Sequence, residues 1–165
     1  MLSMTPEPRR MSGPHNLVRL EIRSTFDLLD FVQSITDCIG PMTGFDEDTT
    51  HWIGVAVRES VINAIKHGNK GDDRKRVMID FALTPTENPS ELIIEVSDQG
   101  TGFAPEEVPN PLAQENLLKS SGRGIFFMSN FMDRVAWEAA PGGGTLVRMV
   151  KRIANGTAAA AHGGD

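Results

Sequence analysis

Cysteine is almost absent from this sequence of 165 residues, in which Cys38 is the only one. A single cysteine cannot form an intrachain disulfide, and a zinc site built from several cysteines is likewise excluded. Long apolar runs are also missing. No stretch approaches the roughly 18–20 residues that cross a bilayer, and no apolar segment of the signal-peptide kind follows the basic start of the chain. We therefore expect a soluble protein without a membrane segment, which is not exported and resides in the cytoplasm.

Positive charge is in short supply as well. Sixteen Lys and Arg stand against 22 Asp and Glu, which gives a formal net charge of −6. Nucleic-acid backbones select for clustered basic side chains, so this balance disfavours direct binding to DNA or RNA. Two phosphate-binding motifs are absent too: no GxxxxGK[ST] occurs, and Pro105 stands where GxGxxG needs its third glycine. Any phosphate must be held by groups that the fold gathers locally.

The hydrophobic content predicts one compact domain with loose ends. Hydrophobic residues make up 39% of the chain, which suits a single core. Residues 1–16 are rich in proline and poor in apolar side chains, and residues 153–165 are mostly alanine and glycine. Such segments have little to bury, so we expect both to be disordered and the folded domain to cover residues 17–152.

Hydrophobic periodicity predicts the elements of this domain. Alternation predicts strands over 17–24, 76–83, 91–98, 134–139 and 144–152, and helical spacing predicts helices over 26–39, 46–66 and 124–132. In the first helix Phe31 and Ile35 share a stripe, and Gly68 is expected to stop the second helix as its C′ residue. The core-facing residues of the second helix are expected to be Ile53, Ala56, Val57 and Ile65. This order of elements predicts an α+β two-layer sandwich, with helices on one face of a mixed, mostly antiparallel sheet.

Residues 98–124 form a long connection rich in glycine, proline and polar groups. A stretch of about 27 residues without regular structure is uncommon inside a small domain and is usually functional. We expect it to act as a mobile lid.

The segment RESVINAIKHG places polar groups on one side of a helix that is otherwise apolar. Glu59 and Asn63 lie one turn apart, and Lys66 and His67 reach round from the following turn. A solvated helix face explains these residues equally simply. Asn63 favours a functional reading, because asparagine has poor helix propensity and this one has apolar neighbours.

The segment DQGTG follows a predicted strand that ends at Asp98. A plain turn accounts for an aspartate and two glycines. Alternatively, Gly100 and Gly102 let the backbone approach a planar ligand, while the Asp98 carboxylate accepts a hydrogen bond from an exocyclic amine.

The segment SGRGIFF sets two glycines, Gly122 and Gly124, at the start of a predicted helix. Free backbone N–H groups and the helix dipole favour an anion there, and glycine allows close approach of a phosphate. Arg123 either adds charge to that phosphate or points to solvent. A simple junction between loop and helix is the other reading.

The three motifs in this order, followed by Thr145 at the start of a strand, resemble the ATP-binding domain shared by gyrase, Hsp90, histidine kinases and MutL. Within that superfamily, VRESVINAIKHGNKGD and ENLLKSSGRGIFFMSNFMD are similar to the small anti-sigma factor serine kinases of the RsbW and SpoIIAB type. The resemblance covers roughly residues 17 to 152. It implies the histidine-kinase-like ATPase fold with an ATP lid.

The resemblance also implies roles for single residues. Asn63 would bind Mg²⁺, and Glu59 would be the base that orients or deprotonates the attacking hydroxyl. Asp98 would contact the adenine amino group. The remaining ATP-site residues would be Gly100, Gly102 and Thr145 near the adenine, Gly122 and Gly124 at the phosphates, and Lys66, His67, Lys119 and Arg123 as phosphate neighbours.

The function implied by the resemblance is transfer of phosphate from Mg²⁺-ATP to a serine or threonine of a partner protein. The substrate would be an anti-sigma factor antagonist of the STAS fold, the second partner an RNA polymerase sigma factor, and the kinase a homodimer. Three alternatives stay open: a switch protein that binds nucleotide without transferring phosphate, a nucleotide-free scaffold, and a relative that regulates a phosphatase or the output of a response regulator instead of a sigma factor.

Overall fold

The computed structural model describes residues 16–102 and 120–154. The expectations of loose ends and most of the predicted lid therefore lie outside the described residues. In chain order, the elements are β1 (Asn16–Arg23), a 3₁₀ turn η1 (Phe26–Leu28), α1 (Leu29–Met42), α2 (Glu47–Asn63), a π-helical turn η2 (Ala64–Gly68), β2 (Arg76–Thr84), β3 (Glu91–Asp98), α4 (Ser120–Phe131), β4 (Arg134–Ala139) and β5 (Thr145–Arg152). The five predicted strands are confirmed. Among the described helices, none is long and apolar enough to cross a membrane.

The strands form one five-stranded sheet in the order β1-β2-β3-β5-β4. Every described pairing is antiparallel, so the expectation of a mixed sheet was wrong within the described residues. The reason is that β5 lies between β3 and β4 and runs antiparallel to both. β3 and β4 point the same way but do not pair with each other. This arrangement places the end of β3 beside the start of β5.

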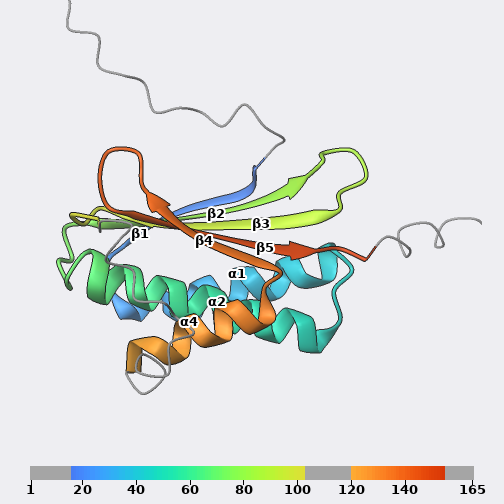
Figure 1. The fold of residues 1–165 in the computed structure, drawn as a ribbon, viewed down its shortest axis with the longest axis horizontal. Helices are drawn as coiled ribbons and strands as arrows, with labels where there is room; N and C mark the ends of the chain where they lie inside the picture. Colours follow the sequence, from blue (N-terminus) through green and yellow to red (C-terminus); the bar gives the residue numbers. More distant parts are fainter. Residues whose placement is uncertain (1–15, 103–119, 155–165) are drawn as a thin grey trace, which may run out of the picture.

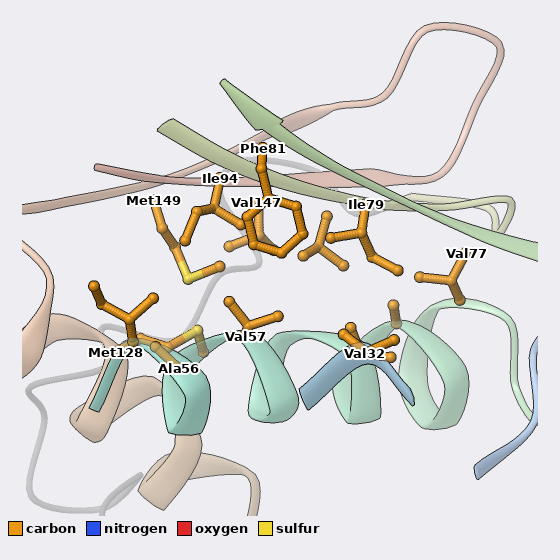
Figure 2. Packing of buried hydrophobic residues seen from close by; sticks show 14 of the residues in the cluster. Val32, Ala56, Val57, Val77, Ile79, Phe81, Ile94, Met128, Val147 and Met149 are labelled. Carbon is orange, nitrogen blue, oxygen red and sulfur yellow. The ribbon is translucent and has the colours of Figure 1, made fainter. Parts of the chain in front are cut away.

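The helices cover one face of the sheet, as predicted, and no described helix lies on the other face (Figure 1). β2 and β3 alternate buried and partly buried residues, the period expected of strands with one face on a core. Figure 2 shows Phe81, Ile94 and Met149 pointing from the sheet toward Val57 of α2 and Val32 of α1. The two-layer α+β sandwich is therefore confirmed.

Helix α1 is rotated relative to the stripe read from the sequence. Its buried side chains are Leu29, Val32, Thr36 and Ile39. Phe31 is 51% exposed, so its expected place on a core stripe was wrong, whereas Ile35 packs against the core. Neighbouring residues in a helix point about 100° apart, so burying Val32 turns Phe31 outward.

Helix α2 begins at an N-cap, where the Asp46 side chain accepts a hydrogen bond from the Thr49 N–H at 2.7 Å. The core residues predicted for this helix, Ile53, Ala56, Val57 and Ile65, are all buried. The helix does not stop before Gly68 as predicted. Instead it widens into η2, which includes Gly68 and has Asn69 as its C-cap.

Helix α4 begins at Ser120, four residues before the predicted start, and packs on α2 (Figure 1). The Trp52 ring of α2 stacks on Phe131 of α4, with centroids 3.9 Å apart and planes inclined by 4°. Ser60 of α2 donates its hydroxyl to the Met128 sulfur at 2.9 Å. These contacts hold α4 against the helix that carries Glu59 and Asn63.

Candidate nucleotide site

Asp98 ends β3 with a side chain that is only 4% exposed. Its Oδ1 accepts hydrogen bonds from the Gly100 N–H at 2.8 Å and the Thr145 N–H at 3.2 Å. Burial raises the pKa of this carboxyl group, and the two backbone hydrogen bonds and the nearby Lys75 charge partly offset that rise. Within the described residues Oδ2 accepts no hydrogen bond. One oxygen of a buried, rigidly held carboxylate is thus available to an amine donor.

Glycines surround this carboxylate because the backbone passes too close for side chains. A Cβ on Gly68 would overlap the Asp98 carboxylate, and one on Gly100 would overlap the Gly68 carbonyl. A Cβ on Gly144 would overlap the Asp98 carbonyl oxygen. Gly102 lies alongside with φ +74°, a conformation that favours glycine, and a Cβ there would lie 3.0 Å from the Gly144 oxygen. The geometry explains the glycines of DQGTG and adds Gly68 and Gly144 to them.

Gly68 has a different reason from the one predicted for it. Its φ is not in the left-handed region, so a helix-stopping C′ conformation does not explain the glycine. Contact with Asp98 does. Gly68 closes the motif RESVINAIKHG but was expected only to stop the helix, and Gly144 precedes Thr145; neither was predicted as a site residue, since their contacts with Asp98 cross from one element to another.

Glu59 and Asn63 lie one turn apart on α2, and both side chains are half-buried. Across the part of the chain that the structure describes, neither side chain makes a hydrogen bond or ion pair, so both polar groups are available to a ligand. Glu59 lies directly against the backbone of Gly124 on α4. Lys66 and His67 follow on η2 and are exposed.

The donor set at this helix suits magnesium better than zinc. No group of three or more His, Cys, Asp or Glu residues that could hold a metal occurs within residues 16–102 and 120–154. Magnesium takes oxygen ligands and often only one or two from the protein, with phosphate and water completing its shell. Asn63 offers a carboxamide oxygen, and Glu59 offers a carboxylate one turn away. These residues fit a Mg²⁺ ion that is bound together with a polyphosphate.

The structure describes only some of the other residues that were predicted to lie near the phosphates. Gly122 and Arg123 lie in the first turn of α4, and Gly124 follows them as a buried residue. Lys119 falls outside the described residues. The structure brings Asp98, Gly100, Gly102 and Thr145 together in one cluster. Asn69 lies beside that cluster, fully buried, and was not predicted because buried asparagines have no sequence signature.

Comparison with known proteins defines the class to which this fold and site belong. Residues 22–151 match the family described as the histidine kinase-like ATPase domain, and the chain belongs to that family.

Individual proteins within this family are similar to the chain over most of its length. The anti-sigma F factor of Clostridium perfringens (strain SM101 / Type A) is 32% identical over 141 residues, which are 84% of this chain and 97% of the relative. The anti-sigma F factor of Bacillus subtilis (strain 168) is 32% identical over 108 residues, or 64% of this chain and 71% of the relative. A serine-protein kinase RsbW of Listeria monocytogenes serotype 4a is 24% identical over 131 residues, or 76% and 81%.

A solved structure shares the fold. It contains the RsbU and RsbW domains of a Mycobacterium tuberculosis protein, with a TM-score of 0.56 and 17% identity. The match covers 82% of this chain and 32% of that longer chain. At this identity the likeness concerns the architecture alone.

Proposed function

We propose that this protein is an ATP-dependent protein serine/threonine kinase that acts as an anti-sigma factor. The observation that carries the proposal is that Glu59 and Asn63 lie one turn apart on α2, in a domain of the histidine kinase-like ATPase family. A protein that only binds nucleotide needs a metal ligand and an adenine acceptor. It has no need of a further carboxylate, such as that of Glu59, one turn from the metal ligand.

Each residue has a part in this chemistry. Asp98 Oδ2 would accept a hydrogen bond from the adenine amino group, and the glycines around it let the backbone pack against the carboxylate. Asn63 supplies one oxygen to Mg²⁺, which when bound neutralises charge on the phosphate oxygens. Lys66, His67 and Arg123 add positive charge near the phosphates. Gly122 and Gly124 allow the start of α4 to approach the phosphates.

Glu59 acts on the protein substrate. Its carboxylate orients the serine or threonine hydroxyl and receives the proton as that oxygen bonds to the γ-phosphorus. The bond from the γ-phosphorus to the β–γ bridging oxygen breaks, and ADP leaves with that electron pair. Such transfer depends on positioning and charge neutralisation more than on a strong base. The distance from the Glu59 carboxylate to the substrate hydroxyl therefore matters more than the basicity of the carboxylate.

The names of the relatives support the choice of partners. Two are anti-sigma F factors and one is a serine-protein kinase. We infer that the chain binds an RNA polymerase sigma factor, phosphorylates a STAS-fold antagonist of the anti-sigma factor, and works as a homodimer in the cytoplasm. A sigma factor with a basic surface would complement the net charge of −6.

The test is transfer of labelled γ-phosphate from ATP to a candidate STAS antagonist. Glu59→Gln keeps the shape of the side chain and removes the base, so transfer should fall at least roughly a hundredfold while ATP binding survives. Glu87→Gln, in the exposed turn between β2 and β3, is the matched control and should transfer like the parent. ATP binding without transfer by the parent would instead favour the non-catalytic switch protein.

A further inference from the structure

Asn69 is a buried polar residue that the proposed chemistry does not use. The residue is 1% exposed, and its side chain makes three hydrogen bonds. Nδ2 donates to the Ser24 hydroxyl oxygen at 3.1 Å and to the Arg76 carbonyl oxygen at 3.0 Å, and Oδ1 accepts from the Gln99 N–H at 2.8 Å. One amide therefore ties the end of η2 to the ends of β1, β2 and β3.

The bonds of Asn69 close a ring with two other residues. The Arg76 N–H donates to the Gln99 side-chain oxygen at 2.7 Å, so Asn69, Arg76 and Gln99 are each bonded to the other two. Rings of this kind, when fully satisfied, hold their members in one arrangement. The join between η2 and the sheet is therefore rigid at this point.

The sequence positions of the ring connect it to the adenine acceptor. Gln99 directly follows Asp98, and Asn69 directly follows Gly68. The hydrogen bond between Asn69 Oδ1 and the Gln99 N–H thus holds Gly68 at the position where its backbone touches the Asp98 carboxylate. Oδ1 of Asp98 is occupied by two backbone N–H groups, so the free Oδ2, which faces Gly68, is the oxygen left for an amine.

We propose that Asn69 is a positioning residue of the nucleotide site, which acts through Gly68 to keep the Asp98 carboxylate open and correctly placed for the adenine amino group. This inference rests on the proposed function, because it assumes that Asp98 binds adenine. Asn69 does not touch the ligand. The phosphate half of the site, on α2, is held by the helix core and does not depend on this ring.

The experiment compares two ligands by competition titration: Mg²⁺-ATP, which has the adenine, and Mg²⁺-tripolyphosphate, which lacks it. In Asn69→Ala the Kd for ATP should rise roughly tenfold, as expected when about 1.4 kcal/mol of recognition is lost, while the Kd for tripolyphosphate stays within about twofold. Ser24→Ala is the matched control, because it removes one bond of Asn69 and leaves the bond to Gln99 intact. It should bind both ligands like the parent.

The titrations are done at a temperature at which circular dichroism shows each variant folded. The Tm of each variant is measured alongside. A merely structural role would lower the Tm of Asn69→Ala without changing the ratio of the two Kd values, and that result would overturn the inference. Equal losses for both ligands would also overturn it.

A second variant covers the case in which Asn69→Ala does not fold. Gly68→Ala places a methyl group on the Asp98 carboxylate directly and should show the same selective loss of ATP affinity. Unchanged ATP affinity in folded Gly68→Ala would overturn the inference. Failure of the parent to bind ATP would overturn the proposed function and this inference together, whereas ATP binding by the parent with unaltered selectivity in the variants would overturn the inference alone.

Discussion

The backbone of Gly124 on α4 packs directly against the carboxylate of Glu59 on α2. A Cβ at position 124 would lie 2.6 Å from Glu59 Oε2 and 3.3 Å from Glu59 Cβ, so the end of the Glu59 side chain would have to move aside. Glycine at this position therefore has a reason that is independent of phosphate binding. The helix that follows the predicted lid is in contact with the proposed base.

We predict that Gly124→Ala impairs phosphate transfer more than ATP binding. The added methyl group would displace the Glu59 carboxylate, and a misplacement of about 1 Å costs on the order of a hundredfold in rate. Steady-state kinetics and ATP titration together should show a kcat that falls by a larger factor than the Kd for ATP rises. Ser129→Ala, an exposed position on the same helix, is the control. A loss of ATP affinity as large as the loss in kcat would show that Gly124 acts through the phosphates and not through Glu59.

Asn63→Ala should abolish the magnesium dependence of nucleotide binding without unfolding the domain. Asn63 is half-buried and makes no hydrogen bond within the described residues, so its removal leaves no polar group unsatisfied. Titration of ATP with and without Mg²⁺ measures the effect, and circular dichroism checks the fold. Binding of Mg²⁺-ATP as tight as that of the parent would show that the metal ligand is another residue.

Asp98→Asn should weaken ATP binding and, at neutral pH, raise the Tm. Burial raises the pKa of Asp98 above its ordinary value of 3.8, so the folded state holds this proton more strongly than the unfolded chain does. Stability from this group is therefore complete below the unfolded pKa and is lost as the pH rises through the folded pKa. Asparagine carries no charge and escapes that loss.

Thermal melts over a pH series measure this effect. The Tm advantage of Asp98→Asn should be present at pH 7. It should shrink as the pH falls toward the ordinary aspartate pKa. A Tm difference that grows on acidification would show that Asp98 stabilises the fold through its charge.

Phe81→Ala should destabilise the domain by about 3–5 kcal/mol, because it removes a large side chain from a fully buried position in the middle of the core. Phe26→Ala makes the same chemical change at a residue that is 53% exposed and should cost less than about 1 kcal/mol. Urea denaturation of the two variants measures both values. Similar losses would mean that Phe26 is covered in the native assembly.

Local patterns were enough to predict the elements. Alternating residues located all five strands, and helical spacing located α1 and α2, because burial of one face repeats every two residues in a strand and every 3.6 in a helix. The stripe on α1 was wrong at Phe31. Several apolar residues lie close together in that helix, so periodicity alone allowed more than one buried face, and packing against α2 and the sheet chose between them.

Some residues of the candidate site could be predicted from local patterns, and others could not. Glu59, Asn63, Asp98 and the glycines of DQGTG could be proposed from the sequence, because each belongs to a short motif that sets polar groups at fixed spacing. Asn69 and Gly144 were not singled out, and Gly68 was expected only to stop a helix. Their importance comes from contacts with Asp98 and Gln99, which lie in another element.

The sequence by itself determined the class of fold, the order of its elements and the chemistry available to the site. Only the tertiary structure decided that Gly68 lies on the Asp98 carboxylate, that Asn69 holds it there, and that Gly124 lies on Glu59. Motifs record which groups are close along the chain. Distances between helix ends, strand ends and a second helix depend on how the two layers pack, and no local pattern specifies them.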